Sequence, residues 1–413
     1  MDVFGKCGKW TDEHVAAIGR DCYFRTLDAV AGGTEADFDG RRVIVASSHD
    51  YLGLSSDPRV REAAITAIRR HGTSLGASRA ASGTRDLHRE FEHRVAVLLD
   101  HESAMVLPSG FQANLMLAPL LGEADRVFTD VSNHASLTEA VELGSAREHR
   151  YLHGDMDHLE ELLGAAGPGA GKIILTDGIF SVDGDICDLP AISDLAGRHG
   201  ARVVVDSSHD LGLLGARGAG APEHFGLRAD VVTAALSKSL ASVGGVIAGP
   251  ARVLRYLRNH SRTAIFTAAV SPANVAAAMA ALDIAGREPE RRVRALDVAE
   301  RLHNGLRALG YDTGASVTPV VPVRAHGHGR CLRMWRHLCD AGVFTTPLTY
   351  PGVRAGREIL RVTLTAAHTD GQLDAVLAAF AELARVEDIR PTAHSPVRIA
   401  RPRAAPAVAV ASP

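Results

Sequence analysis

A lysine closes the stretch Val231-Val232-Thr233-Ala234-Ala235-Leu236-Ser237-Lys238, in which a run typical of a buried strand gives way to a polar turn. The chain contains four lysines in 413 residues and uses arginine for nearly all of its other positive charges. Lysine differs from arginine because its amine can lose its proton near neutral pH. The stretch therefore predicts a buried strand that ends in a chemically active amine.

A second strand end carries further reactive side chains, in Val203-Val204-Val205-Asp206-Ser207-Ser208-His209. Asp206 and His209 follow one apolar strand, and Lys238 follows the next. This set suits a pyridoxal phosphate (PLP) site, where the lysine forms a Schiff base, the aspartate keeps the pyridinium nitrogen protonated and the histidine reaches the phenolic oxygen. On these residues alone, the alternative is a solvated lysine beside a helix cap.

Short apolar runs alternate with helical patterns over the first 270 residues, which predicts an α/β architecture with a mainly parallel sheet. Strands are expected at residues 43–46, 104–107, 126–128, 172–176, 203–206, 231–234 and 245–248, and helices at 58–70, 88–99, 113–121 and 189–199.

The pattern changes near residue 271. Long helical patterns at 272–285 and 290–309 lead into strands at 317–323, 345–348 and 359–364 and a last helix at 370–385. We therefore expect a smaller α+β domain. The expected limits are an N-terminal segment (1–45) that packs with the small domain, a large PLP-binding domain (46–270), the small domain (271–388) and a disordered tail (389–413).

Composition excludes several classes of protein. A net charge of −3 with 23% charged residues gives no basic footprint for nucleic acid. The five cysteines are scattered without metal-type pairing and indicate free thiols in a reducing compartment. No apolar run approaches the ~20 residues that a membrane span needs. We expect a cytoplasmic protein without a metal site.

Three loops at expected strand ends could complete a cofactor site. Ser109-Gly110-Phe111 opens a helix and offers a hydroxyl and backbone N–H groups to a phosphate, although Ser109 could also simply cap that helix. His134 opens another helix and could lie flat on an aromatic ring, although a cap or surface position is the common alternative. Ser181 could face the ring, and the neighbouring Asp183-Gly184 also suits an ordinary turn.

Further motifs extend this set along the chain. In order they are His49–Leu54, Gly76–Arg79, Ser109–Asn114, Asn133–Leu137, Phe180–Asp185, Asp206–His209, Ser237-Lys238 and Leu360–Thr369. Each motif is weak alone, but the ordered set resembles the α-oxoamine synthase family of fold-type-I PLP enzymes. The resemblance runs from about residue 47 to about residue 383, roughly four-fifths of the chain.

The resemblance implies a large domain with a mainly parallel seven-stranded sheet and a smaller α+β C-terminal domain. It also implies decarboxylative condensation of a small α-amino acid with an acyl thioester, carried on coenzyme A or an acyl carrier protein. The products would be an α-aminoketone, carbon dioxide and a free thiol. Fold-type-I enzymes build the site at a two-fold interface, so a homodimer with shared active sites is expected.

Catalytic roles follow from the resemblance. Lys238 would hold the internal aldimine and later abstract the Cα proton. Asp206 would keep the pyridine nitrogen charged, His209 would bind the phenolic oxygen, and His134 would stack on the ring.

The resemblance also implies contacts to the cofactor's phosphate and to the substrate. The cofactor-binding residues would be Ser109, Gly110, Phe111, Ser181, Ser237 and Thr267. Thr267 belongs to the segment 266–272, which resembles a loop that reaches the neighbouring subunit's phosphate. Arg361 would grip the amino acid's carboxylate with two hydrogen bonds, and His49 and Ser78 would lie at the substrate.

Four departures from the family pattern concern this site. His49 stands where Asn is usual, Ala235 where a hydroxyl residue is usual, and Asp177 where Glu is usual, while the threonine of the 266–272 loop is displaced to Thr267. Ser237 is close enough in sequence to replace the missing hydroxyl. These changes leave the substrate open and fit a specialised biosynthetic enzyme.

Two alternatives remain. One is an aminotransferase or decarboxylase on the same fold, which needs no thioester. The other is a non-catalytic partner subunit, against which the intact set of Lys238, Asp206 and His209 argues.

Overall fold

The structure is a computed structural model that describes residues 2–8, 22–29, 32–167, 169–389 and 397. Contacts group the chain into two compact units. Among the described residues, the large unit comprises those within 49–181 and 185–296, and the small unit comprises those within 2–48, 182–184 and 297–397. Almost all of the expected tail (389–413) lies outside the described residues.

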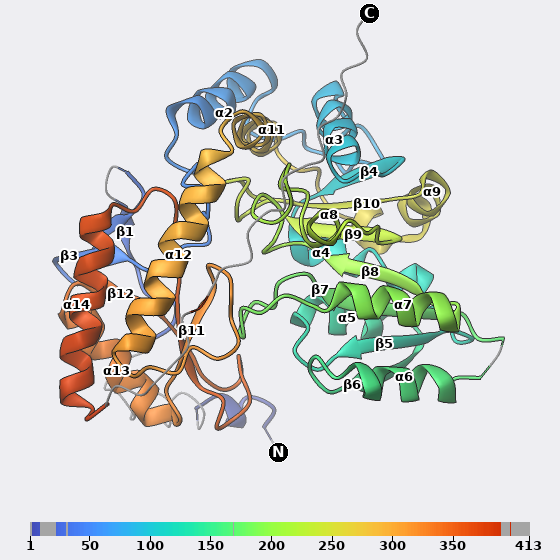
Figure 1. Ribbon diagram of the computed structural model, residues 1–413. Helices are drawn as coiled ribbons and strands as arrows, with labels where there is room; N and C mark the ends of the chain where they lie inside the picture. Colours follow the sequence, from blue (N-terminus) through green and yellow to red (C-terminus); the bar gives the residue numbers. More distant parts are fainter. Residues whose placement is uncertain (1, 9–21, 30–31, 168, 390–396, 398–413) are drawn as a thin grey trace, which may run out of the picture. The chain divides into compact units, whose positions relative to one another are not determined.

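The large unit contains a seven-stranded sheet with the order β4-β10-β9-β8-β7-β5-β6 (Figure 1). Neighbouring strands from β9 to β6 are parallel, and β10 is antiparallel to both β4 and β9. The strands are β4 (Ser103–Leu107), β5 (Arg126–Asp130), β6 (Arg147–Tyr151), β7 (Lys172–Asp177), β8 (Arg202–Asp206), β9 (Val231–Ala235) and β10 (Gly245–Gly249). The expected mainly parallel seven-stranded sheet is confirmed.

Helices pack against this sheet, and α6 and α7 lie side by side along β5 to β8 (Figure 1). All residues of β9 are buried, as expected for a strand inside a sheet that is covered on both faces. The helices are α2 (Pro58–His71), α3 (Asp86–Leu98), α4 (Gly110–Leu115), the short 3₁₀ helix η1 (Ala118–Leu120), α5 (Ala135–Leu143), α6 (Met156–Ala165), α7 (Leu189–His199), α8 (Ala221–Phe225), α9 (Ala251–His260), α10 (Arg262–Ile265) and α11 (Pro272–Arg287).

Two strands differ from the sequence expectation. The run at 43–46 does not join the large sheet, because β3 (Arg41–Val45) pairs with β2 (Glu35–Phe38) and β12 (Val343–Phe344) in the small unit. The seventh strand of the large sheet is instead β6, which lies at the edge of the sheet beside β5. Its sequence Arg-Glu-His-Arg-Tyr buries only Tyr151, because an edge strand needs few apolar residues.

The small unit holds two further sheets, with the orders β1-β2-β3-β12 and β11-β14-β13. Their remaining strands are β1 (Asp28–Ala29), β11 (Val321–Arg324), β13 (Thr346–Leu348) and β14 (Ile359–Val362), and the helices are α13 (His328–Asp340) and α14 (Asp370–Val386). Trp335 of α13 is buried at the centre, packs edge-on against Phe38 and Phe344, and donates its Nε1–H to the carbonyl oxygen of Thr345 at 3.2 Å.

One helix differs from the expected domain limits. Residues 272–285 were expected in the small domain, but α11 packs mainly on α2 and also on α3 and belongs to the large unit. The chain passes into the small unit within α12 (Glu290–Ala308). The limits of the domains themselves stay a prediction.

No helix in the described part of the chain is long and apolar enough to cross a membrane. Within the same residues, no group of three or more His, Cys, Asp or Glu side chains is arranged to hold a metal ion.

Candidate active site

A cavity of about 200 Å³ lies in the large unit, where the carboxyl ends of β7, β8 and β9 meet the start of α4. We call it the strand-end cavity. Its lining residues are Ser109, Gly110, Phe111, Asn114, His134, Ser136, Asp177, Ile179, Asp206, Ser208, His209, Ala235, Ser237 and Lys238. Ligands of open α/β sheets gather at this edge of the strands.

Lys238 and Asp206 reach this cavity from neighbouring strands. β8 and β9 run parallel with Asp206 opposite Thr233, so both strands deliver their following residues to the same edge of the sheet. Lys238 is half-buried, and a turn fixes its backbone because its carbonyl oxygen accepts from the N–H of Ala241 at 3.0 Å. The predicted acid and amine are therefore brought together.

Asp206 is almost fully buried, at 4% exposure. Its Oδ2 accepts from Nδ2 of Asn114 at 2.6 Å, and its Oδ1 accepts from the N–H of Ser208 at 2.9 Å. Both donors are neutral. A buried carboxylate is stable when a cation or strong hydrogen bonds compensate its charge, so a cation on a bound ligand would complete the pairing of Asp206.

Asn114 links Asp206 to the rest of the site. Its Oδ1 accepts from the hydroxyl of Thr233 at 2.6 Å, which fixes the orientation of the amide. Its Nδ2 donates to Ser136 Oγ at 2.8 Å as well as to Asp206. Ser136 Oγ in turn lies 2.7 Å from Nδ1 of His134. One buried amide therefore connects the aspartate with the predicted ring-stacking histidine.

The start of α4 approaches β9 closely. A Cβ atom added to Gly110 would lie 2.6 Å from the Cβ of Ala235, closer than two such atoms can approach. Ser109 caps the helix, because its Oγ accepts from the N–H of Gln112 at 3.1 Å, and it also lines the cavity. The first N–H groups of a helix have no partner within the helix, so the N–H groups of Gly110 and Phe111 suit an anionic group.

His134 both caps α5 and lines the cavity. Its backbone N–H donates to Oδ2 of Asp177 at 3.0 Å, and its ring contacts Phe111 edge-on with centroids 6.2 Å apart. Burial and the nearby charge of Asp206 raise the pKa of Asp177 well above its usual range. The other carboxyl oxygen of Asp177, Oδ1, is buried without a hydrogen-bond partner, so it remains available to a ligand in the cavity.

His209 is held by a tyrosine outside the cavity lining. The hydroxyl of Tyr51 lies 2.6 Å from Nδ1 of His209 and 3.3 Å from Nδ1 of His49. The rings of His49 and His209 meet edge-on with centroids 5.2 Å apart. His49 therefore contacts the ring of a predicted catalytic residue without lining the cavity itself.

Four other predicted residues do not line the cavity. Thr267 Oγ1 accepts from Nε2 of Gln112 on α4 at 3.3 Å. Ser78 forms an isolated antiparallel bridge with Ala268. Ser181 is half-buried in the loop after β7, and Arg361 lies on β14 of the small unit. Their roles stay predictions.

Six lining residues were not predicted to bind cofactor or substrate, although two of them, Asp177 and Ala235, were noted as departures at this site: Asn114, Ser136, Asp177, Ile179, Ser208 and Ala235. Asn114 left a usable signal, because it lies one turn after Gly110 next to the fully buried Ala113, and a buried asparagine needs partners. Asp177 ends an apolar strand, as Asp206 does. The contribution of Ser208, whose Oγ accepts from the N–H of Ala235 at 2.8 Å, depends on the pairing of strands and left no such signal.

These side chains fit PLP. An amine, a buried carboxylate with neutral partners, an imidazole and a helix start face one cavity, which matches a ligand with an aldehyde, a protonated ring nitrogen, a phenolic oxygen and a phosphate.

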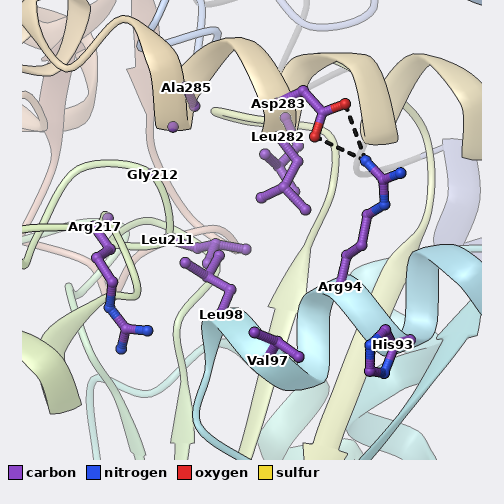
Figure 2. A pocket seen from close by; sticks show the side chains of 13 residues that line it. His93, Arg94, Val97, Leu98, Leu211, Gly212, Arg217, Leu282, Asp283 and Ala285 are labelled. Carbon is purple, nitrogen blue, oxygen red and sulfur yellow. Dashed lines mark hydrogen bonds and ion pairs between the residues drawn. The ribbon is translucent and has the colours of Figure 1, made fainter. Parts of the chain in front are cut away.

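A larger cavity, of about 480 Å³, lies between α3, α11 and the glycine-rich loop after β8 and contains none of the predicted site residues. Figure 2 shows Leu98, Leu211 and Leu282 gathered there, with Arg94 turned to Asp283. This arginine is already paired, since its Nη1 donates to both carboxyl oxygens at 2.9 and 3.0 Å. The larger cavity therefore does not carry the predicted chemistry.

The aminotransferase class I and II family matches residues 41–380. The chain belongs to that family. It is 37% identical to a serine palmitoyltransferase (SPT) of Sphingobacterium spiritivorum over 88% of this chain and 91% of the relative. It is 40% identical to an 8-amino-7-oxononanoate synthase of Symbiobacterium thermophilum over 84% of this chain and 90% of the relative.

Solved structures agree with this placement. A high-resolution structure of SPT with PLP internal aldimine superposes with a TM-score of 0.91 and 29% identity, covering 94% of this chain and all of the other. The resemblance to the α-oxoamine synthases, the fold-type-I architecture and the PLP cofactor are thereby confirmed. The chain is a PLP-dependent acyltransferase of the α-oxoamine synthase type.

Proposed function

We propose that the protein condenses a small α-amino acid with an acyl thioester, releasing carbon dioxide and a free thiol and giving an α-aminoketone. The observation that carries this proposal is the convergence of Lys238 and Asp206 on one cavity, in a chain 37–40% identical to an SPT and an 8-amino-7-oxononanoate synthase. The carrier of the acyl group is coenzyme A or an acyl carrier protein.

Bound in the strand-end cavity, PLP supplies an electron sink for the charge that develops at the Cα of the amino acid. Lys238 would hold the cofactor covalently, and its amine would also take the proton from Cα of the amino acid. Asp206 would keep the ring nitrogen protonated, because a buried carboxylate favours a cation beside it. His209 would donate to the phenolic oxygen.

Other residues orient the cofactor. Ser109 and the N–H groups of Gly110 and Phe111 would hold the phosphate with support from Ser237, and Thr267 would reach it from the neighbouring subunit. His134 would stack on the ring, and Ser181, which lies in the loop after β7 outside the cavity lining, would face it. Hydrogen bonds through Ser136 and Asn114 connect His134 with Asp206. These bonds hold the two side chains in fixed relative positions.

Three predicted residues would bind the substrate. Arg361 binds the amino acid's carboxylate, for which a guanidinium offers two parallel donors. Ser78 and His49 lie at the substrate's polar end. Because His49 stands where the resemblance leads us to expect Asn, we expect it to change which amino acid or thioester is accepted.

A homodimer with shared sites is part of the proposal. Segment 266–272 resembles the loop that reaches the neighbouring subunit's phosphate in this family, and Phe266 within it is 80% exposed. The apolar groups around the larger cavity and the exposed Val97 and Val243 give a second copy further surface to cover. A cytoplasmic location and the lack of a nucleic-acid partner also stay predictions.

The decisive experiment pairs glycine, alanine and serine with a panel of acyl thioesters and measures free-thiol release. We expect release that requires both substrates and is accompanied by carbon dioxide. Amino acid consumption without a thioester would identify an aminotransferase or decarboxylase instead, and no turnover with any pair would favour a non-catalytic subunit.

Lys238→Ala tests the assigned lysine, and Lys172→Ala is its matched control. We expect Lys238→Ala to lose covalent PLP and to lower the rate by roughly 10²–10⁴-fold, the range of a lost acid–base group, while Lys172→Ala stays active. Borohydride reduction followed by peptide mapping places the cofactor. A label on Lys6, Lys9 or Lys172 would contradict the assignment.

A further inference from the structure

Asp177 carries an oxygen atom for which the described part of the chain supplies no partner. The residue ends β7, lines the strand-end cavity and is 3% exposed. Its Oδ2 accepts from the backbone N–H of His134 at 3.0 Å, whereas its Oδ1 is buried without a hydrogen-bond partner. A buried polar atom without a partner is rare and costs free energy. A ligand in the strand-end cavity would remove this cost by pairing with Oδ1.

A second carboxyl group stands on the neighbouring strand. Asp177 and Asp206 lie opposite each other at the ends of the parallel strands β7 and β8. Two buried carboxyl groups at one site do not readily both ionise, because like charges repel strongly away from water. Asp206 accepts from two donors, the amide of Asn114 and the N–H of Ser208, whereas Asp177 accepts from one. The negative charge of the pair therefore falls on Asp206.

The groups around Asp177 lead to the same assignment. Burial is the main cause that raises the pKa of Asp177 well above its usual range, and the charges of Asp206 and Asp130 raise it further. The N–H of His134 and the amine of Lys238 act in the opposite direction but do not outweigh burial. Near neutral pH the carboxyl group of Asp177 is therefore protonated and uncharged.

The remaining titratable neighbours of Asp177 add no charge of their own. Burial raises the pKa of the Tyr151 hydroxyl and of the Cys187 thiol, so both side chains are neutral near neutral pH. Because Oδ2 of Asp177 already accepts from an N–H, the proton of the acid belongs on Oδ1. Asp177 thus offers a hydrogen-bond donor to the cavity, where an ionised aspartate would offer only acceptors.

We propose that Asp177 is a further cofactor-binding residue, whose uncharged carboxyl group donates a hydrogen bond from Oδ1 to an oxygen atom of the bound PLP. Asp206 is then the charged member of the pair, and its single negative charge matches the single positive charge of a protonated ring nitrogen. The inference rests on PLP as the cofactor of the proposed function, but it does not depend on which substrates are condensed.

Infrared spectroscopy of the full-length protein reads the protonation state directly, because the C=O stretch of a protonated carboxyl group lies apart from the bands of carboxylates. The band of Asp177 is the difference between the wild type and Asp177→Asn near neutral pH. We expect a protonated-carboxyl band in the cofactor-free protein and a change in its frequency when PLP is added, because a new hydrogen bond alters the stretch. Absence of the band, or a band that does not respond to PLP, overturns the proposal.

Asp210→Asn supplies the matched control for the infrared measurement. Asp210 is also buried and its Oδ1 likewise lacks a hydrogen-bond partner, but it does not line the strand-end cavity. Burial raises the pKa of Asp210 to about 7, so its protonated band is recorded below that pH. We expect this band to keep its frequency when PLP is added. Equal changes in both bands would show that PLP acts on the whole large unit rather than on Asp177, which overturns the proposal.

Three variants separate a donor from a charge at residue 177, with the dissociation constant of PLP measured by visible absorbance. Asp177→Asn keeps an uncharged side chain that both accepts and donates, so we expect a change of less than about threefold. Asp177→Leu removes the donor and should raise the constant roughly tenfold or more. Asp206→Asn removes the charge of the pair and should also raise it at least about tenfold.

Two outcomes of this comparison overturn the proposal. If Asp177→Asn weakens binding as much as Asp206→Asn does, residue 177 acts as an anion. If Asp177→Leu binds PLP as the wild type does, residue 177 makes no hydrogen bond to the cofactor. Folding of each variant is checked first by circular dichroism. Should Asp177→Leu not fold, the infrared band and the comparison of the two asparagine variants decide without it.

These readouts need no turnover, so they separate this inference from the proposed function. If residue 177 behaves as proposed but no substrate pair is condensed, the proposed function fails and the inference stands. If condensation occurs but the cofactor-free protein lacks the protonated band of Asp177, the inference fails and the proposed function stands.

Discussion

Asn114 shows how a single side chain organises the candidate active site. It donates to Asp206 and Ser136, accepts from Thr233, and is 1% exposed. A buried amide with all three contacts made is rigid, and a variant that cannot make them leaves its partners unpaired.

Asn114→Leu should therefore weaken PLP binding, because Asp206 loses its shortest hydrogen bond beside the position of the ring nitrogen. We expect the dissociation constant of PLP to rise roughly tenfold or more, measured by visible absorbance during titration of the cofactor-free protein. Asn259→Leu, at an exposed position on α9, is the control. A change of less than about twofold for Asn114→Leu would show that Asp206 keeps its place without the amide.

His49 is the residue at which substrate preference is expected to change. An imidazole is larger than a carboxamide and can carry a positive charge near its ordinary pKa of about 6.5. We expect His49→Asn to shift the ratio of kcat/KM between competing amino acids or thioesters by roughly tenfold, or about 1.4 kcal/mol, while covalent PLP binding is kept. If the ratio is the same across the whole panel, specificity is set elsewhere, for which residues 75–81 and 349–351 are the next candidates.

At the scale of elements, an ion-paired histidine joins two loops of the site. His153, after β6, contacts Asp130 at the end of β5 through Nδ1 and Asp185 in the loop after β7 through Nε2, both at 3.0 Å. Its ring also packs edge-on against Phe180 with centroids 4.5 Å apart. The first loop carries His134 and the second carries Ser181, so His153 fixes the loop after β5 relative to the loop after β7.

The pKa of His153 gives this contact a defined pH range. Burial lowers the pKa, but the hydrogen bonds to Asp130 and Asp185 outweigh it and raise the pKa from 6.5 to about 10. The folded-state pKa lies above the unfolded one, so the stabilisation is fully present below about pH 6.5 and is lost as the pH rises through about 10.

We expect His153→Gln to lower the free energy of unfolding by roughly 2 kcal/mol at pH 6, measured by urea denaturation, with the difference from the wild type shrinking as the pH approaches 10. His260→Gln, an exposed position on α9, is the control. A difference that stays constant with pH would mean that the histidine acts by packing on Phe180 rather than by its charge.

Sequence patterns predicted elements with a strong apolar signal and missed those without one. The helix expected at 189–199 is α7 with the same bounds, because Asp188 caps it and Gly200 ends it. β6 was missed because an edge strand needs few apolar residues, and the run at 43–46 was expected in the large sheet because pattern alone cannot assign a strand to a sheet.

The same holds for the residues of the candidate site. Lys238 and Asp206 could be predicted because they follow apolar strands, whereas the role of Asn114 depends on hydrogen-bond partners that the sequence does not reveal.

At the scale of the whole molecule, the proposed homodimer with shared active sites predicts complementation between inactive subunits. Lys238→Ala removes the amine, and a second variant, Thr267→Ala with Ala268→Glu, damages the segment expected to reach the neighbouring subunit. After subunit exchange, one of the two sites in each mixed dimer is intact. Random pairing should then restore about a quarter of wild-type activity, read by thiol release.

Each variant is first checked alone for folding by circular dichroism and for lack of activity. Exchange itself is verified with differently tagged subunits. No recovery despite proven exchange would mean that each chain builds its site alone.

The close approach of α4 to β9 links two positions in evolution. Gly110 can gain no side chain while β9 keeps its position, because an added Cβ would lie 2.6 Å from the Cβ and 2.9 Å from the Cα of Ala235, and residue 235 is where the resemblance to the family leads us to expect a hydroxyl. Residue 235 can therefore carry a larger side chain only while residue 110 is glycine. Replacement of this glycine would require β9 to move away from α4. The two positions are therefore constrained in the order in which they can be substituted. In an Ala235→Ser variant, the new hydroxyl would have to fit against the Cα of Gly110.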